Sequence, residues 1–295
     1  MKYATVLYRG EPIPVVLSDN VRRAIPINDV LGTSYPDLIS FISKNTEEQI
    51  DSLRKAAASD GGIDMSQVKL VAPIQKPIHD ILCVGVNYVS HLEETKQHFD
   101  GGGKFQSPEK TVFFSKRTIR IVGPDESILA HEDLDEKLDY EVELAVILGG
   151  TIDSSVDYDG IADRIFGYSV FNDVSARELQ ARHLQWYVGK SLDTFCAMGP
   201  WIVSADEIAM NEGLDIESRV NGEVRQHSNT KYMRRNVSNL LYDFSRGITL
   251  EAGDILATGT PAGVGQGFTP PRFMKKGDVV EVEVERIGTL RNTVV

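Results

Sequence analysis

Residues 139–148 read Asp-Tyr-Glu-Val-Glu-Leu-Ala-Val-Ile-Leu, and polar and apolar side chains alternate along the first half of this stretch. A period of two predicts a β-strand, in which successive side chains point to opposite faces. Asp139, Glu141 and Glu143 would then share one face, while the other face is apolar throughout. Because the acidic face itself turns apolar from Ala145 onwards, we expect the strand to run from a polar site into the core.

Three carboxylates on one face of a strand repel one another unless a cation lies between them. Ligand sets made only of oxygen atoms suit Mg²⁺ or Mn²⁺. The alternative is a half-exposed strand whose acidic face is simply solvated. The strand alone leaves both interpretations open.

Another acidic position follows a second apolar strand. Asp173 comes just after a strand expected over 165–171 and just before a helix expected over 175–184, whose first four residues have the spacing of a capping box. Ends of strands that lead into helices often carry functional residues in sheet-based folds. The alternative role for Asp173 is a turn or helix cap. On the helix, Arg177 and Gln180 are three residues apart and point to one side.

Two glycine-containing segments invite comparison with anion-binding loops. Gly189-Lys190-Ser191 resembles the end of a phosphate-binding loop, but Leu184 stands where that motif needs glycine, so we exclude a nucleotide-binding loop. The glycine-rich run 258–265, which contains Thr260, follows an expected strand and could present backbone N–H groups to an anion.

His91 and Glu94 are three residues apart, a spacing that places both on one side of a short helix. A carboxylate beside a histidine can orient the ring as a general base. The alternative is an ordinary pair on the protein surface.

The remaining patterns divide the chain into a small N-terminal module, residues 1–68, and a larger region, residues 69–295. The module has two expected strands, a helix expected over 35–43, and a second helix that begins at the capping box Thr46-Glu47-Glu48-Gln49. The best linker candidate is Ser59-Asp60-Gly61-Gly62. Many short strands and few helices follow, including a hairpin at Asn221-Gly222. These patterns predict an α+β fold dominated by β-structure, with a small N-terminal α/β module.

Composition narrows the class of protein. The chain has 295 residues with 31 Lys and Arg against 43 Asp and Glu, a net charge of −12. This balance argues against nucleic acid or an anionic membrane as a partner. No apolar run is long enough to span a bilayer, and the first residues do not form a signal peptide. Cys83 and Cys196 lie in apolar contexts, as expected for a cytoplasmic protein. We therefore expect a soluble, acidic enzyme in the cytoplasm.

Several of these motifs occur together in a known family. Asn87-Tyr88-x-x-His91-x-x-Glu94, the stretch 138–145, Asn172-Asp173-Val174-Ser175-Ala176-Arg177-Glu178-Leu179-Gln180, Gly189-Lys190-Ser191, Val220-Asn221-Gly222-Glu223 and Thr258-Gly259-Thr260-Pro261 follow the order seen in the fumarylacetoacetate hydrolase family. The resemblance covers about residues 70–295, and the first 68 residues match no motif of it. It is greatest to bacterial single-chain members that act on small 2-oxo acids, such as acylpyruvate hydrolases and oxaloacetate decarboxylases.

The resemblance implies a layered mixed β-sheet fold and a homodimer. It also implies one Mg²⁺ or Mn²⁺ per subunit, bound by Glu141, Glu143 and Asp173. The substrate would be held by Lys190, which also counts among the catalytic residues, and by Arg177, Gln180 and Thr260. The catalytic pair His91 and Glu94 would lie on a lid that closes over the substrate and activates water, and residues 95–110 would continue that lid.

These expectations point to metal-dependent cleavage of a C–C bond in a small 2-oxo or 2,4-dioxo acid. Hydrolysis and decarboxylation would use the same residues, since in both a cation stabilises the charge of a developing enolate. One alternative is an enol–keto isomerase of a hydroxymuconate-type diacid. Another is a non-catalytic protein that binds a metal and a 2-oxo acid. The loss of His91, Glu94 or Lys190 would mark such a protein, and this sequence retains all three.

Overall fold

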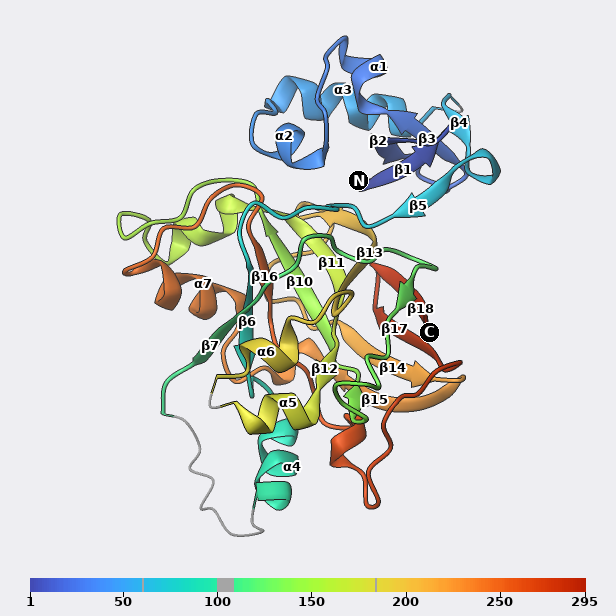
Figure 1. Ribbon diagram of the computed structural model, residues 1–295. Coiled ribbons are helices and arrows are strands. Elements are labelled where there is room, and N and C mark those ends of the chain that lie inside the picture. The colour runs from blue at the N-terminus through green and yellow to red at the C-terminus, as the bar shows by residue number, and fades with distance from the viewer. Residues whose placement is uncertain (60, 100–108, 184) are drawn as a thin grey trace.

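A large mixed sheet runs through the computed structural model, which describes residues 1–59, 61–99, 109–183 and 185–295 (Figure 1). Its eleven strands are ordered β4 (Ile63–Asp64), β3 (Arg23–Pro26), β2 (Glu11–Leu17), β1 (Lys2–Tyr8), β13 (Cys196–Ser204), β11 (Ile165–Asp173), β10 (Val142–Leu148), β16 (Ile255–Ala257), β6 (Ile81–Gly85) and β7 (Val112–Lys116), with β5 (Lys69–Val71) also paired to β1. The pairs are antiparallel, except that β16 and β6 run parallel.

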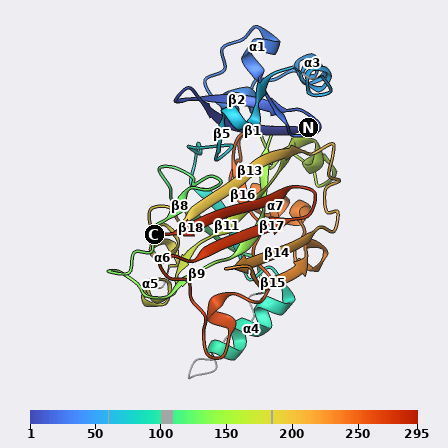
Figure 2. The same cartoon turned by 90° about the vertical axis from the view of Figure 1, so that its right-hand side faces the viewer.

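A second sheet packs against the first and forms another layer (Figure 2). Its order is β15 (Glu223–Asn229), β14 (Asp215–Val220), β17 (Val279–Val284), β18 (Gly288–Val294) and β8 (Ser127–Ile128). A short separate pair joins β9 (Leu138–Asp139) to β12 (Ser175–Ala176). The β-dominated, layered mixed-sheet fold expected from the sequence is therefore confirmed.

Helices lie around these sheets. They are α1 (Ile27–Leu31), α2 (Leu38–Ile42), α3 (Glu47–Ala57), α4 (Val89–Phe99), α5 (Arg177–Arg182), α6 (Tyr187–Lys190) and α7 (Val237–Ser245), with the 3₁₀ segments η1 (Met65–Gln67), η2 (Asp159–Arg164), η3 (Thr230–Tyr232) and η4 (Gly265–Gly267). Among the described residues, no helix has the length and apolar character needed to cross a bilayer.

Strand β10 has one apolar face in each of two hydrophobic clusters, which explains its position in the middle of the fold. Val142, Leu144, Val146 and Leu148 pack into the cluster between the two sheets. On the opposite face, Ala145 and the following Ile147 belong to a cluster shared with the N-terminal elements. The expected change from an acidic to an apolar face along this strand is thus confirmed.

The N-terminal elements continue the main sheet. Strand β1 pairs with β13, with Tyr3 opposite Ile202, and the Tyr3 ring lies 4.9 Å from that of Phe166 (centroid to centroid). Helix α3 begins at the predicted capping box, in which Thr46 and Gln49 exchange hydrogen bonds. The proposed boundary between residues 68 and 69 remains a prediction, and the two sides of it share one hydrophobic cluster.

Two local predictions were wrong. The strand expected over 139–148 is broken, because β9 ends at Asp139, β10 begins at Val142, and β9 pairs with β12 outside the main sheet. The capping box expected at Ser175 is absent, since Ser175 belongs to β12 and its hydroxyl donates to the Asp173 carbonyl (3.0 Å). In both places, pairing between distant strands overrides the local pattern.

Candidate active site

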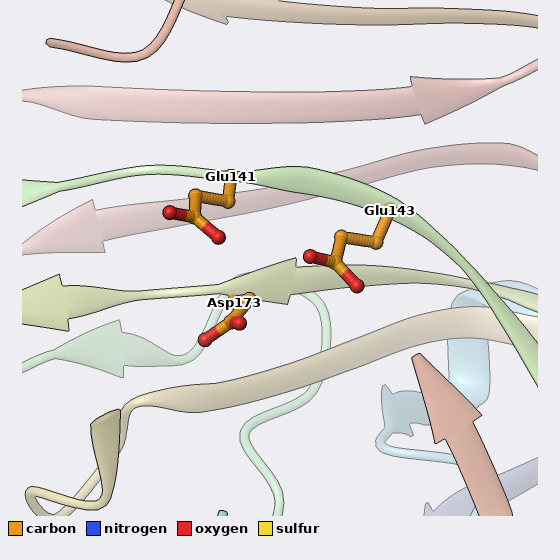
Figure 3. Close-up of side chains that lie close together, drawn as sticks. All are labelled: Glu141, Glu143 and Asp173. Carbon is orange, nitrogen blue, oxygen red and sulfur yellow. The ribbon is translucent and has the colours of Figure 1, made fainter. Parts of the chain in front are cut away.

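Three carboxylates converge where strands β10 and β11 lie side by side. Glu141 immediately precedes β10, Glu143 is its second residue, and Asp173 is the last residue of β11. The strands are antiparallel with Val142 opposite Asn172, so Glu141 and Asp173 face each other, and the Asp173 N–H donates to the Glu141 carbonyl (2.9 Å). Figure 3 shows the three side chains pointing toward one another.

The geometry of this cluster fits a metal site. Each carboxylate offers an oxygen within 4.8 Å of the other two, and all three side chains are buried. Oxygen donors with full negative charge are the ligands that Mg²⁺ and Mn²⁺ prefer. The three residues expected to bind the cation are therefore together, and they could hold one.

Of the three carboxylates, Glu143 has the fewest contacts that offset its negative charge. Its Oε2 accepts one hydrogen bond, from the Gly259 N–H (2.8 Å). Burial raises the pKa of Glu143 well above its usual value, and the neighbouring charges of Asp173 and Glu141 raise that pKa further. A bound cation would favour the ionised form of this carboxyl group.

Lys190 bridges the other two carboxylates. Its Nζ lies 2.8 Å from Glu141 Oε2 and 2.9 Å from Asp173 Oδ2. Burial alone would lower the pKa of Lys190, but the charges of Asp173 and Glu141 outweigh burial and raise it. Burial alone would likewise raise the pKa of Glu141, but the charges of Lys190 and Arg177 lower it to about 2. Both groups are thus held in their charged forms.

Sequence reasoning missed a second buried lysine. Lys116 ends strand β7, is fully buried, forms an ion pair with Asp173 Oδ1, and donates to the Val174 carbonyl (2.8 Å). Its only sequence signal is a position at the end of the apolar run Val112-Phe113-Phe114, and a lysine at a strand end usually lies in solvent. The contact with Asp173, 57 residues away, depends on the order of the strands.

Arg177, at the start of α5, has most of its guanidinium occupied by acceptors. Its Nε lies 2.8 Å from Asp139 Oδ2, and its Nη1 lies 2.7 Å from Glu141 Oε1 and 3.0 Å from Gln180 Oε1. Its Nη2 is buried and has no hydrogen-bond partner among the described residues. The arginine therefore has an unused donor beside the carboxylate cluster.

His91 and Glu94 form the expected pair on helix α4. His91 Nδ1 lies 3.0 Å from Glu94 Oε2, and Glu94 Oε1 accepts the Gly263 N–H (2.9 Å). Helix α4 is thereby attached to the glycine-rich segment. The expected continuation of the lid at 95–110 includes Gly101-Gly102-Gly103, which lie outside the described residues.

The glycine-rich segment does present its N–H groups to anions, but the anions are side chains of the protein itself. Gly259 donates to Glu143, Gly263 to Glu94, and Gly265 to Asp139. Thr260 donates its hydroxyl to the Val142 carbonyl (2.9 Å) and accepts from Gln226 (2.7 Å). This segment therefore positions the carboxylates of the site.

A cavity of about 290 Å³ joins these groups. Its polar lining includes seven of the predicted site residues, whereas Glu143 and Asp173 lie outside it. The polar lining residues are His91, Glu94, Glu141, Arg177, Gln180, His183, Lys190, Thr260 and Gln266. The rest is largely apolar, with Val84, Val86, Phe114, Trp186 and Val264. The structure thus brings together all nine residues predicted from the sequence, and their individual roles remain predictions.

Comparison with known proteins gives the same region a family context. Residues 80–295 match the model of the fumarylacetoacetate (FAA) hydrolase C-terminal domain. The chain is 44% identical over 230 residues to oxaloacetate tautomerase YisK of Bacillus subtilis, an alignment that covers 78% of this chain and 74% of that protein.

Several solved structures are similar along the whole chain. Fumarylacetoacetate hydrolase from Exiguobacterium antarcticum has 38% identity and a TM-score of 0.82, with 100% of this chain and 99% of that one covered. Maleylpyruvate hydrolase from Sphingobium sp. SYK-6, solved with manganese(II) and pyruvate, has 26% identity and a TM-score of 0.77 with the same coverage.

Proposed function

This chain belongs to the fumarylacetoacetate hydrolase family, and we propose that it is a metal-dependent enzyme that interconverts the enol and keto forms of oxaloacetate or a similar small 2-oxo acid. Its relatives include enzymes that act on small organic acids, and the relative with 44% identity is named an oxaloacetate tautomerase. The family agrees with the resemblance found in the sequence motifs. The reaction and substrate are our proposal.

The unused donor of Arg177 is the observation that carries the proposal. A buried N–H without an acceptor is costly, about 1–3 kcal/mol, and a charged donor costs more. Arg177 lines the cavity, so a carboxylate bound there would pair with its guanidinium in a charge-assisted hydrogen bond. The site therefore suits an anionic substrate small enough for a cavity of about 290 Å³.

A divalent cation is the proposed cofactor, held by Glu141, Glu143 and Asp173. When bound, it would supply a Lewis acid that stabilises negative charge developing on the 2-oxo oxygen. The donor set and the manganese(II) in a structural neighbour support this assignment, and either Mg²⁺ or Mn²⁺ fits it.

The chain's own residues can supply the remaining requirements of a tautomerase. Conversion of an enol to a keto form moves a proton from oxygen to carbon, which needs a group that accepts and donates protons. His91 lines the cavity, and Glu94 holds its ring through Nδ1. Lys190 and Arg177 place positive charge beside the same space, which favours an enolate-like transition state.

Cleavage of a C–C bond, which was the leading expectation from the sequence, is the second candidate. The His91–Glu94 pair supports hydrolysis, because the same geometry can activate a water molecule. Decarboxylation needs no water, and it would use the cation and Lys190. Both reactions share their site with the tautomerase.

An assay that separates the products distinguishes these reactions. The purified protein is mixed with the enol form of oxaloacetate and Mg²⁺ or Mn²⁺, and enol absorbance is followed in parallel with pyruvate and CO₂. We expect the enol to disappear faster than with the metal alone, without matching release of CO₂, and a chelator to remove the effect. Release of CO₂ in step with enol loss would instead identify a decarboxylase.

A panel of acylpyruvates and hydroxymuconate-type diacids in the same assay tests the hydrolase and isomerase alternatives. Binding of these acids without any turnover would identify the non-catalytic binding protein. Light scattering tests the expected homodimer.

A further inference from the structure

Asp139 is a buried carboxylate beside the site that none of the roles above uses. It is fully buried, and it is not among the carboxylates that converge on the candidate metal position. A buried charge is tolerated only when it is paired and hydrogen-bonded. The hydrogen-bond partners of Asp139 therefore show which parts of the structure this carboxylate holds in place.

Four N–H groups surround Asp139. Its Oδ1 accepts from the N–H groups of Tyr140 (2.9 Å) and Gly265 (2.6 Å), and its Oδ2 accepts from the Gln266 N–H (3.0 Å) and from Arg177 Nε (2.8 Å). These bonds occupy both oxygens. The carboxylate thus joins β9, η4 and α5, which are far apart in the sequence.

Glycine at position 265 makes this arrangement possible. A Cβ atom there would lie 2.6 Å from Asp139 Oδ1 and 2.6 Å from the Arg272 carbonyl oxygen, closer than atoms can pack. The neighbouring Gln266 lines the cavity. The segment therefore approaches Asp139 closely and forms part of the cavity wall.

Asp139 can influence the cavity through Arg177, because the planar guanidinium of Arg177 binds Asp139 and Arg177 lines the cavity. Asp139 holds Nε, and Glu141 with Gln180 holds Nη1, so the direction of the remaining Nη2 is determined. Nη2 is the donor that has no acceptor among the described residues. Loss of the bond to Nε would leave the arginine held from one side only.

We propose that Asp139 is a positioning residue that orients Arg177, and thereby sets the affinity of the site for the carboxylate group of its substrate. This inference rests on the proposed function, which makes Arg177 a receptor for that carboxylate. Asp139 neither ligates the cation nor touches the substrate in this arrangement. Its effect is therefore on binding of the anion.

Calorimetry with pyruvate as the probe, at saturating Mg²⁺, tests this role in the full-length protein. Asp139→Asn keeps the shape of the side chain and removes its charge. We expect its Kd for pyruvate to rise about 10- to 100-fold, the range for one hydrogen bond to a charged group. Its Kd for Mg²⁺ without pyruvate should stay within about threefold of the wild-type value, as expected for a group outside the ligand set.

A double-mutant cycle distinguishes orientation of Arg177 from a general structural effect. If Asp139 acts through Arg177, Asp139→Asn adds little to the loss of pyruvate affinity in Arg177→Gln. Asp135 offers a matched control, because it is a buried aspartate that accepts from the α5 residue Leu179 (2.8 Å) and does not line the cavity. Asp135→Asn should keep wild-type pyruvate affinity.

Three results would overturn the proposal: unchanged pyruvate affinity in Asp139→Asn, additive losses in the double mutant, or an equal loss in Asp135→Asn. Arg177→Lys covers the case in which Asp139→Asn does not fold. It keeps the charge but lacks the planar fork, so we expect weaker pyruvate binding, and wild-type affinity would contradict a requirement for orientation.

Turnover separates this proposal from the proposed function. Where oxaloacetate is turned over, Asp139→Asn should raise KM more than it lowers kcat. A wild-type protein that binds pyruvate but does not tautomerise oxaloacetate would reject the proposed reaction and leave the role of Asp139 intact.

Discussion

At the scale of single residues, the site is a buried cluster in which four carboxylates face three cationic side chains. The acids are Asp139, Glu141, Glu143 and Asp173, and the cations are Lys116, Arg177 and Lys190. The cations contact every acid except Glu143, for which no ion pair appears among the described residues. A divalent cation would balance the remaining negative charge of the cluster and give it a small net positive charge. That charge would favour an anionic substrate.

The raised pKa of Glu143 predicts that protons compete with the metal. Burial, Asp173 and Glu141 raise this pKa, so the carboxyl group takes up a proton at a higher pH than an ordinary glutamate as the pH falls. Metal affinity should therefore weaken as the pH is lowered through the raised pKa, by up to about tenfold per pH unit for one proton displaced. Titration of Mn²⁺ by calorimetry across that range measures this slope.

Glu143→Gln serves as the control, since its amide cannot titrate. It should bind Mn²⁺ more weakly at every pH and with a flatter pH dependence. A wild-type affinity that does not vary with pH would contradict a role for Glu143 as a ligand that must lose a proton.

The Lys116–Asp173 pair predicts a stability effect. Both side chains are fully buried, so Asp173→Ala leaves the ammonium group of Lys116 without a carboxylate to which it is bonded in the native state. Breaking one side of a buried ion pair typically costs about 3–5 kcal/mol of unfolding free energy. Chemical denaturation should show this loss in Asp173→Ala and a smaller loss in the double variant Lys116→Met/Asp173→Ala.

Both variants should lose Mn²⁺ affinity, because Asp173 is a proposed ligand. Equal stability losses in the single and double variants would show that the ammonium group is not the source of the cost.

At the scale of elements, helix α4 rests on the glycine-rich segment that follows β16. Glu94 accepts the Gly263 N–H, and a Cβ at position 267 would lie 1.8 Å from Glu94 Oε1. Only glycine at position 267 permits this contact without a shift. The glycine-rich segment therefore contacts α4 in the same region in which it binds the carboxylates of the site.

Gly267→Ala should push the Glu94 carboxylate away from its position beside Gly263, and so disturb the His91–Glu94 pair. Because a positioned general base is typically worth about 10²–10⁴-fold, we expect kcat/KM to fall by at least about tenfold. Mn²⁺ affinity should change little, since no proposed ligand lies on α4. Gly247→Ala is a suitable control, because a Cβ there meets no atom within 4 Å. Equal activities for the two variants would contradict the role of the glycine-rich segment in positioning the His91–Glu94 pair.

At the scale of the whole molecule, the N-terminal elements extend the main sheet beyond β13 (Figure 1). Their buried side chains share a hydrophobic cluster with one face of that sheet. Tyr3, Phe41 and Phe166 form a group of ring contacts across the predicted boundary at residue 68. Without the first 68 residues, β13 would become an exposed edge beside an uncovered apolar surface. Exposed edges of this kind pair with other chains.

A chain that begins at residue 69 should therefore aggregate or fold poorly, as size-exclusion chromatography and circular dichroism would show. As a control, a short Gly-Ser insertion at the exposed turn Arg9-Gly10 should leave the full chain monodisperse, because loop tips tolerate insertions. A soluble, cooperatively folded fragment 69–295 would instead show that the N-terminal module is dispensable for the fold.

The sequence by itself determined the features that depend on near neighbours. The alternation at 139–148 predicted that one face of β10 is apolar throughout and that the other changes from acidic to apolar. Thr46 and Asn221-Gly222 marked a helix start and a hairpin. The ordered motifs identified the family and nine residues that lie together. Such patterns succeed because side-chain period, capping and turn geometry are local properties of the backbone.

Only the tertiary structure decided the contacts between distant segments. Lys116 meets Asp173 and Glu94 meets Gly263 because of the order in which strands pair and helices pack, which no local pattern records. The same long-range pairing broke the acidic strand after Asp139 and placed Ser175 in a strand in spite of its capping pattern. Local preferences differ by about 1 kcal/mol or less per residue, so the hydrogen bonds and burial gained in a sheet override them.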